Sequence, residues 1–294
     1  MDIALNTDYL TSGGAPDPYL RMLAEAGFTH LHWCHQWCTD FLYSSYETEH
    51  YAKILKEYGL KLLDIHGSAG KEKCWFSTEE YCRKSGVELV RNRIEMFMEL
   101  EGSGSLMMHI PFFHFQKDDE EKRKAKRVQF EALKRSLDDL MPSLEKHHVR
   151  IAVENMAGDT FELIRELMDS YPEEYIGITY DCGHGNIDPC KGLDYLEPLK
   201  NRLQALHLHD NDTAGDQHQP PFMGKVDWQR LAGIIASSSY TNRPMSFEIA
   251  MRNTPFYEPE LKIDQKPENI RAFLADTYER CRKFAEMELA ATQK

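Results

Sequence analysis

The sequence has no long hydrophobic run and no excess of positive charge. No window approaches about 18 uninterrupted apolar residues, and the amino-terminal MDIALN leads into a strand-like segment without a signal-peptide pattern, so neither a membrane span nor export is predicted. The formal net charge is -13, which repels a phosphate backbone. The one dense basic run, Lys122 to Arg127, adjoins Glu120 and Glu121 and is typical of a solvated helix face. Nucleic acid is therefore not the expected partner.

Paired cysteines and nucleotide-binding motifs are also missing. The seven cysteines are odd in number, lack CxxC spacing and occur in a chain too long to need disulfide staples, which favours a reducing cytoplasm. The chain contains no Walker loop, no GxGxxG after a strand and no GxSxG elbow. Nucleotide, dinucleotide and serine-hydrolase functions thus lack their signatures.

Eight short apolar runs alternate with segments of helical periodicity along the 294 residues. The predicted strands are Ile3 to Asn6, Thr29 to Cys34, Lys61 to His66, Leu106 to Ile110, Arg150 to Asn155, Ile176 to Asp181, Ala205 to His209 and Met245 to Ile249. The predicted helices are Pro18 to Ala26, Glu49 to Tyr58, Thr78 to Glu101, Asp119 to His147, Thr160 to Ser170, Leu193 to Lys200, Trp228 to Ala236 and Glu268 to Ala290.

This alternation predicts a parallel sheet, because a parallel crossover needs a connection of helix length. Eight units favour closure into a (β/α)₈ TIM barrel, an α/β fold that reaches about 250 residues or more as one domain. We therefore expect residues 1–294 to form a single barrel domain. A doubly wound open sheet is the alternative, since nothing local proves closure.

Side chains of the types that bind metals lie at the carboxyl ends of six of the predicted strands. In a barrel the carboxyl ends of the strands meet at one face, so residues far apart in sequence can share one coordination sphere. Carboxylates after apolar runs are costly to bury unless they are paired or bind a metal. These strand-end residues are His66, His109, Glu154, Asp181, His184, His207, His209 and Glu248.

The seventh predicted strand and the loop after it hold further candidates. His207 and His209 are two residues apart on one strand and should face the same way, and we favour the deeper His207 as the ligand. His209 is then a supporting or substrate-facing residue. The loop that follows carries Asp216 and His218 in a DxH pattern, which is weak alone but would lie over the same site.

A second group of histidines and cysteines lies near the end of the second predicted strand. His32, Cys34, His35 and Cys38 have the composition of a zinc knot, but Trp33 and Trp37 between them favour an aromatic substrate wall or simple packing.

The most specific motifs are VEN at 153–155, DCGH at 181–184, HLHDND at 207–212 followed by DQHQPPFMGKVDW at 216–228, and FE at 247–248. With these the chain resembles the xylose-isomerase-like barrel superfamily over essentially its whole length. That superfamily includes sugar phosphate isomerases and epimerases and the endonuclease IV group.

The resemblance to the isomerases and epimerases implies one divalent metal, such as zinc, manganese, magnesium or cobalt, held by Glu154, Asp181, His207 and Glu248. It also implies that His184 contacts substrate. The two glutamates, Glu154 and Glu248, would move a proton through an enediolate intermediate while the metal polarises the carbonyl. The expected partner is a small sugar or sugar phosphate, in carbohydrate metabolism, with a homo-oligomer left open.

The endonuclease IV group gives the competing reading, a phosphodiesterase with several zinc ions. Its further ligands match His66, His109, His184, Asp216 and His218, so more than one ion is compatible with the sequence. The acidic net charge and the absence of an evident basic groove-binding loop oppose a role in DNA repair. A non-catalytic binding protein is the third reading, since the fold does not fix function.

Overall fold

The structure is a computed structural model that describes residues 2–111 and 120–293. Eight strands occur in it: β1 (Ile3–Asn6), β2 (His30–Trp33), β3 (Lys61–His66), β4 (Leu106–His109), β5 (Ile151–Glu154), β6 (Ile176–Asp181), β7 (Leu203–His207) and β8 (Met245–Phe247). Seven ladders pair them in parallel in the order β7-β6-β5-β4-β3-β2-β1-β8. Hydrogen bonds from the Leu208 amide to Ser246 and from the Glu248 amide to Leu208 join β7 to β8. The (β/α)₈ barrel prediction is therefore confirmed and the open sheet is excluded.

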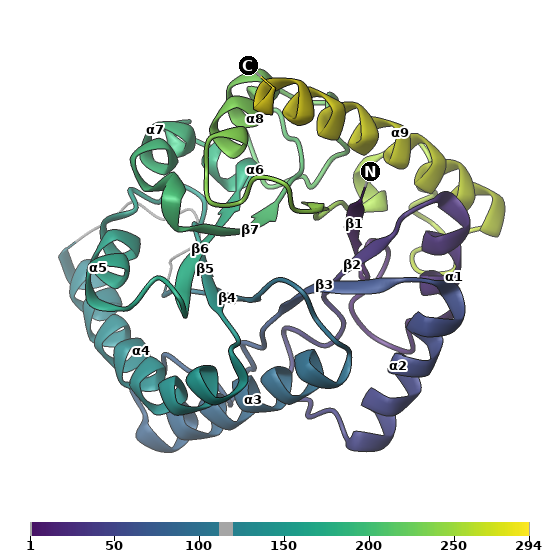
Figure 1. Ribbon diagram of the computed structural model, residues 1–294. Helices are drawn as coiled ribbons and strands as arrows, with labels where there is room; N and C mark the ends of the chain where they lie inside the picture. The colour runs from purple at the N-terminus through teal and green to yellow at the C-terminus, as the bar shows by residue number, and fades with distance from the viewer. Residues whose placement is uncertain (1, 112–119, 294) are drawn as a thin grey trace.

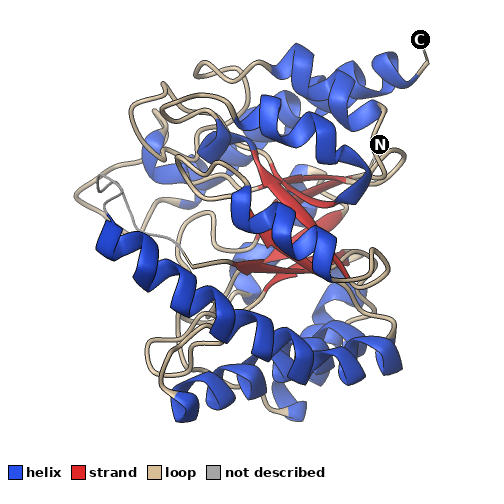
Figure 2. Cartoon of the chain, turned by 90° about the vertical axis from the view of Figure 1, so that its left-hand side faces the viewer, coloured by secondary structure: helices blue, strands red, loops and turns tan. Residues whose placement is uncertain are grey.

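Helices surround the barrel on its outside (Figures 1 and 2). They are α1 (Asp17–Ala26), α2 (Ser45–Tyr58), α3 (Glu80–Glu99), α4 (Glu120–His147), α5 (Glu162–Ser170), α6 (Cys182–Gly185), α7 (Gly192–Leu196), α8 (Trp228–Ala236) and α9 (Pro267–Thr292), with the 3₁₀ turns η1 (Glu197–Arg202) and η2 (Met251–Asn253). No described helix has both the length and the apolar character needed to cross a membrane. Asp119, the predicted start of α4, lies outside the described residues.

The sequence misses α6 and places β7 two residues too late. Asp181 caps α6 by accepting a hydrogen bond from the His184 amide at 2.7 Å, so the four-residue turn follows the strand without the apolar periodicity of a longer helix. On β7 the strand ends at His207, and His209 lies beyond it. The apolar run LQALH, buried throughout, is the segment that pairs with β6.

A glycine allows the chain before α3 to pass close to that helix. A Cβ on Gly86 would lie 2.3 Å from the backbone nitrogen of Trp75, a contact that no side chain tolerates. The close approach seats the indole of Trp75, which is fully buried and donates a hydrogen bond to the His109 carbonyl at the end of β4. Gly86 thus helps to position one strand end of the barrel mouth.

Gly86→Ala should lower the free energy of unfolding by about 1–3 kcal/mol, because the added methyl group must displace backbone. Gly233→Ala is the matched control, since Gly233 lies in α8 with open space around its Cα. That change should raise stability by about 0.5–1 kcal/mol through helix propensity. Urea unfolding followed by circular dichroism measures both, and equal effects of the two substitutions would contradict this account.

Candidate metal centre

Four side chains converge at the carboxyl ends of neighbouring strands. Glu154, Asp181 and His207 are the last residues of β5, β6 and β7, and Glu248 directly follows β8. One donor atom from each lies within 4.8 Å of the donor atoms of the other three. Three of them are buried, whereas the side chain of Glu248 is 14% exposed. Closure of the barrel thus brings together donors that are far apart in the sequence.

The imidazole of His207 lies between the two glutamates. Its Nδ1 is 2.6 Å from Glu154 Oε1 and 2.6 Å from Glu248 Oε2. Burial alone would lower the pKa of His207, but the carboxylates of Glu248 and Glu154 hold it well above its usual range. Burial likewise opposes ionisation of the glutamates, yet His207 keeps the pKa of both carboxyls well below the usual value. The cluster therefore stabilises positive charge at its centre.

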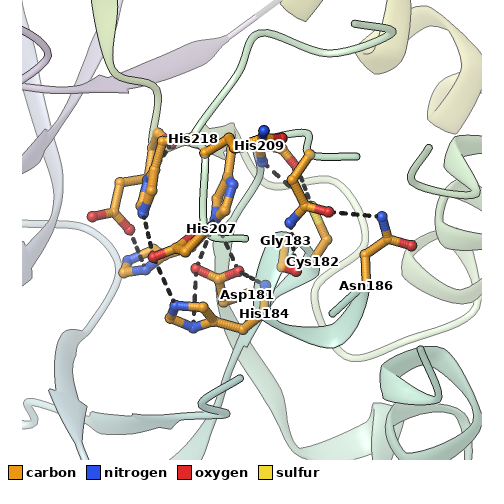
Figure 3. Close-up of polar contacts among 12 residues, drawn as sticks. Asp181, Cys182, Gly183, His184, Asn186, His207, His209 and His218 are labelled. Carbon is orange, nitrogen blue, oxygen red and sulfur yellow. Dashed lines mark hydrogen bonds and ion pairs between the residues drawn. The ribbon is translucent and has the colours of Figure 1, made fainter. Parts of the chain in front are cut away.

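Asp181 is held by the VEN motif and by the segment after β7. The side-chain amide of Asn155 donates to the Asp181 carbonyl, and its oxygen accepts from the Asp181 amide, each at 2.9 Å. His209 Nε2 lies 2.9 Å from the Asp181 carboxylate (Figure 3). The asparagine thereby fixes β6 against β5 at the depth where the donors meet.

A second donor group adjoins the first on the side of β3 and β4. His66, His109 and Glu154 each offer one atom within 4.8 Å of the others, and His109 Nε2 is 2.8 Å from Glu154 Oε2. Burial and the neighbouring His109 place the pKa of His66 well below its usual value, which keeps a nitrogen lone pair available. The Trp37 ring packs on His66 with centroids 4.3 Å apart.

A third group, His209, Asp216 and His218, adjoins the centre on the other side. The rings of His209 and His218 stack at 4.0 Å and 7° (Figure 3). His218 Nε2 is 3.1 Å and His184 Nε2 3.3 Å from the Asp216 carboxylate. Burial opposes protonation of His218, but the hydrogen bond to Asp216 raises its pKa to about 9.

The chemistry of these donors fits a divalent cation. The central group has three carboxylates and one imidazole, a mixture that suits zinc, manganese, magnesium or cobalt. Buried donor atoms without a hydrogen-bond partner among the described residues include His207 Nε2, His209 Nδ1 and Asp216 Oδ1. The side chains therefore combine a net negative charge with buried donor atoms that lack a partner, an arrangement that suits a bound cation.

A cavity of about 370 Å³ opens beside the centre. It lies within the usual size range of small-molecule sites. Its wall includes Asp8, Trp37, His218, Glu248 and Arg252. A larger hollow of about 760 Å³ is lined by His30, Lys61 and α2, at the opposite end of the strands from these donors. Of these two cavities, the smaller one can present a ligand to the donor groups.

One sequence expectation around β2, the substrate-wall role of Trp33, needs correction. Trp33 is fully buried and packs on Tyr43 and Tyr51, so it does not form a substrate wall as Trp37 can. The histidines and cysteines of this region do not converge as a zinc knot: His35 pairs with Thr7, whereas the His32 ring lies 4.4 Å from that of His207.

Sequence reasoning overlooked Asp64 and considered His32 only as part of a zinc knot, whereas the two side chains pair inside the barrel. Strand alternation gave a signal for Asp64, because it is two residues before His66 in KLLDIH and therefore faces the same way.

Asp216→Asn should lower the pKa of His218 in the metal-free protein from about 9, because burial is then opposed by Glu248 and Asp181 alone. Nitrogen-15 NMR titration of the imidazoles measures it. Asp212→Asn changes an exposed carboxyl in the same loop and should leave His218 unaltered. A His218 still titrating near 9 in the Asp216 variant would refute the pairing.

The same shift has a consequence for stability, because the folded-state pKa of His218 is raised. The stabilisation from this histidine should be complete below about pH 6.5 and should be lost as the pH rises through about 9.

Comparison with known proteins finds a sequence relative over most of the chain and solved structures that match almost all of it. The uncharacterized protein y4fM of Sinorhizobium fredii is 32% identical over 255 residues, covering 79% of this chain and 80% of that protein. A crystal structure of D-psicose 3-epimerase in the presence of D-fructose has a TM-score of 0.74 at 14% identity, covering 97% of this chain and 99% of the other. The IOLI protein with a binding zinc atom has a TM-score of 0.66 at 12% identity, covering 99% and 98%.

At these identities the two structures establish likeness of fold alone. The sequence profile of the xylose isomerase-like TIM barrels matches residues 20–273, which is most of the chain. Together with the relative at 32% identity and the barrel itself, this match shows the family. The chain belongs to the xylose isomerase-like TIM barrel family.

Proposed function

We propose that this protein is a metal-dependent isomerase or epimerase of a sugar or sugar phosphate. The observation that carries the proposal is the convergence of Glu154, Asp181, His207 and Glu248 within 4.8 Å, beside a cavity of small-molecule size. The likeness in fold to D-psicose 3-epimerase and to the IOLI protein with a bound zinc atom supports the same combination of sugar chemistry and metal.

The two glutamates would perform the proton transfer. Both carboxylates lie 2.6 Å from the same His207 nitrogen, and both have a pKa well below the usual value, so both are ionised near neutral pH, the form that a general base requires. Glu248 lines the cavity and would take the proton from the carbon next to the substrate carbonyl. Glu154, which is buried deeper, would gain a proton from solvent and deliver it to that carbon or its neighbour, while Glu248 releases its proton to solvent.

A bound divalent ion would supply stabilisation of the negative charge that develops on the substrate oxygen. Glu154, Asp181, His207 and Glu248 would hold it. His184, whose Nδ1 lies 3.0 Å from the Asn155 carbonyl, would orient substrate from the side of α6. The Trp37 ring would cover one face of the sugar and exclude water from the enediolate.

Glu154→Gln and Glu248→Gln should each reduce turnover by about 10²–10⁴-fold while the fold is retained, because each removes one proton acceptor. The assay follows deuterium uptake from D2O into D-fructose, D-psicose, D-tagatose and their phosphates by NMR with manganese- or cobalt-loaded protein. Glu260→Gln removes an exposed carboxyl and should leave the exchange rate unchanged. The assigned mechanism fails if Glu154→Gln retains the wild-type rate, and the proposed reaction class fails if the loaded wild-type protein exchanges none of the probes.

A metal-dependent phosphodiesterase is the second candidate, and the two flanking groups are the observation that favours it. His66 and His109 share Glu154 with the central group, while His209, Asp216 and His218 adjoin Asp181. Three ions could therefore be accommodated side by side. The net charge of -13 acts against a nucleic-acid substrate.

The number of ions and the cleavage of a phosphodiester separate the two functions. A sugar isomerase should need one tightly bound ion per chain, measured by atomic emission after dialysis, and should not incise an abasic DNA duplex at low salt. His218→Gln should then leave the count at one, because this histidine lies outside the central group. Three retained zinc ions together with incision of the duplex would favour the phosphodiesterase instead.

A further inference from the structure

We propose that His32 is a further nitrogen ligand of the ion, held from inside the barrel by Asp64. This inference rests on the metal site of the proposed function and adds a residue to it. His32 Nδ1 and Asp64 Oδ1 are 2.5 Å apart, and the two side chains are 0% and 2% exposed. Neither lines the rim of the barrel. The pair lies deeper in the barrel than the four residues of the central group, before the ends of β2 and β3.

An irregularity in the sheet brings this pair together. Leu31 pairs with Leu62, but the next residue, His32, pairs with Asp64, so the register of β2 and β3 shifts by one residue between them. A bulge of this kind redirects a side chain and is frequent next to active sites. With a regular ladder, Leu63 would stand opposite His32, and the imidazole would have no carboxylate partner.

The carboxylate also determines which nitrogen of His32 is free. A carboxylate has no proton to donate, so Nδ1 of His32 donates to Asp64 and Nε2 carries the lone pair. That Nε2 atom is buried and has no hydrogen-bond partner among the described residues. A carboxylate bound to one nitrogen of a histidine while the other binds an ion is a frequent arrangement at metal sites.

The free side of His32 faces residues of the central group. One donor atom each of His32, His207 and Glu248 lies within 4.8 Å of the other two, and the rings of the two histidines are 4.4 Å apart. His207 and Glu248 are members of both this triad and the four-residue group. His32 is not grouped with Glu154 and Asp181 at this distance, so an ion that lies close to His207 and Glu248 is the one that His32 can reach.

The extra imidazole has a consequence for the choice of metal. The central group of Glu154, Asp181, His207 and Glu248 alone supplies three carboxylates and one nitrogen, a set that magnesium also accepts. A second nitrogen shifts the preference to zinc or cobalt, for which imidazole is the better ligand. The structure thereby assigns a role to a buried histidine–aspartate pair that the proton transfer does not use.

His35 provides a matched control on the same segment. It is also buried, its Nε2 also lacks a partner among the described residues, and its Nδ1 bonds to Thr7 rather than to a carboxylate. It belongs to none of the donor groups found among the described residues. Loss of a buried imidazole as such can thus be separated from loss of a ligand.

The test measures metal binding in the full chain, independently of turnover. Crystals soaked in zinc chloride should give an anomalous peak about 2.0–2.1 Å from His32 Nε2. In solution, His32→Gln should change the visible spectrum of the cobalt-loaded protein and should weaken zinc binding in a chelator competition. Asp64→Asn should weaken it about 10–100-fold, because His32 loses its orienting partner. His35→Gln should change neither the spectrum nor the affinity.

If the ion is bound by the four residues of the central group and lies more than about 3 Å from His32 Nε2, this inference is overturned and the proposed function stays intact. The same holds if the spectrum of the His32→Gln protein equals that of the wild type. A wild-type protein that binds neither zinc nor cobalt would overturn both. The crystal measurement needs no variant, so it decides the question even if His32→Gln fails to fold.

Discussion

Carboxylates buried within a few ångströms of one another need positive charge between them. Glu154 is almost completely buried and Glu248 is close to it, so their mutual repulsion and their lost hydration both favour the neutral acids. The histidines reverse this tendency, and without a metal they must do so as imidazolium ions. A divalent cation would provide the same compensation and would leave the imidazoles neutral, as ligands. The raised pKa of His207 and the lowered pKa of Glu154 thus have the directions expected where the surroundings favour positive charge.

The barrel makes such a concentration of charge possible because its strands are rigid and registered. Asn155 hydrogen-bonds both backbone groups of Asp181 and so fixes the ends of β5 and β6 at one depth. The bridge at Leu208 does the same between β7 and β8. Donors on strands held in this way need little reorganisation to bind an ion, which is the condition for strong electrostatic stabilisation of a transition state.

The centre is not symmetric, and the asymmetry suits proton transfer. Glu248 borders the cavity, whereas Glu154 lies behind it and contacts His109 as well as His207. A carboxylate that is open to substrate and another that is enclosed have different surroundings, although the same imidazole lowers the pKa of both. The flanking histidines enlarge the region in which ions or phosphate groups could be held, which is why the phosphodiesterase reading has a structural basis and not only a family resemblance.

The sequence by itself determined the parallel alternation of strands and helices and the residues at the strand ends, because period and strand polarity are local properties, whereas closure of the sheet into a barrel was left to the tertiary structure. Glu154, Asp181 and His207 could be found in this way. The tertiary structure alone decided that Trp33 packs behind β2, that β7 ends at His207, and that His32 meets Asp64. These outcomes depend on register between strands, and a shift of one residue is invisible in the composition of either strand yet moves a side chain to a different partner.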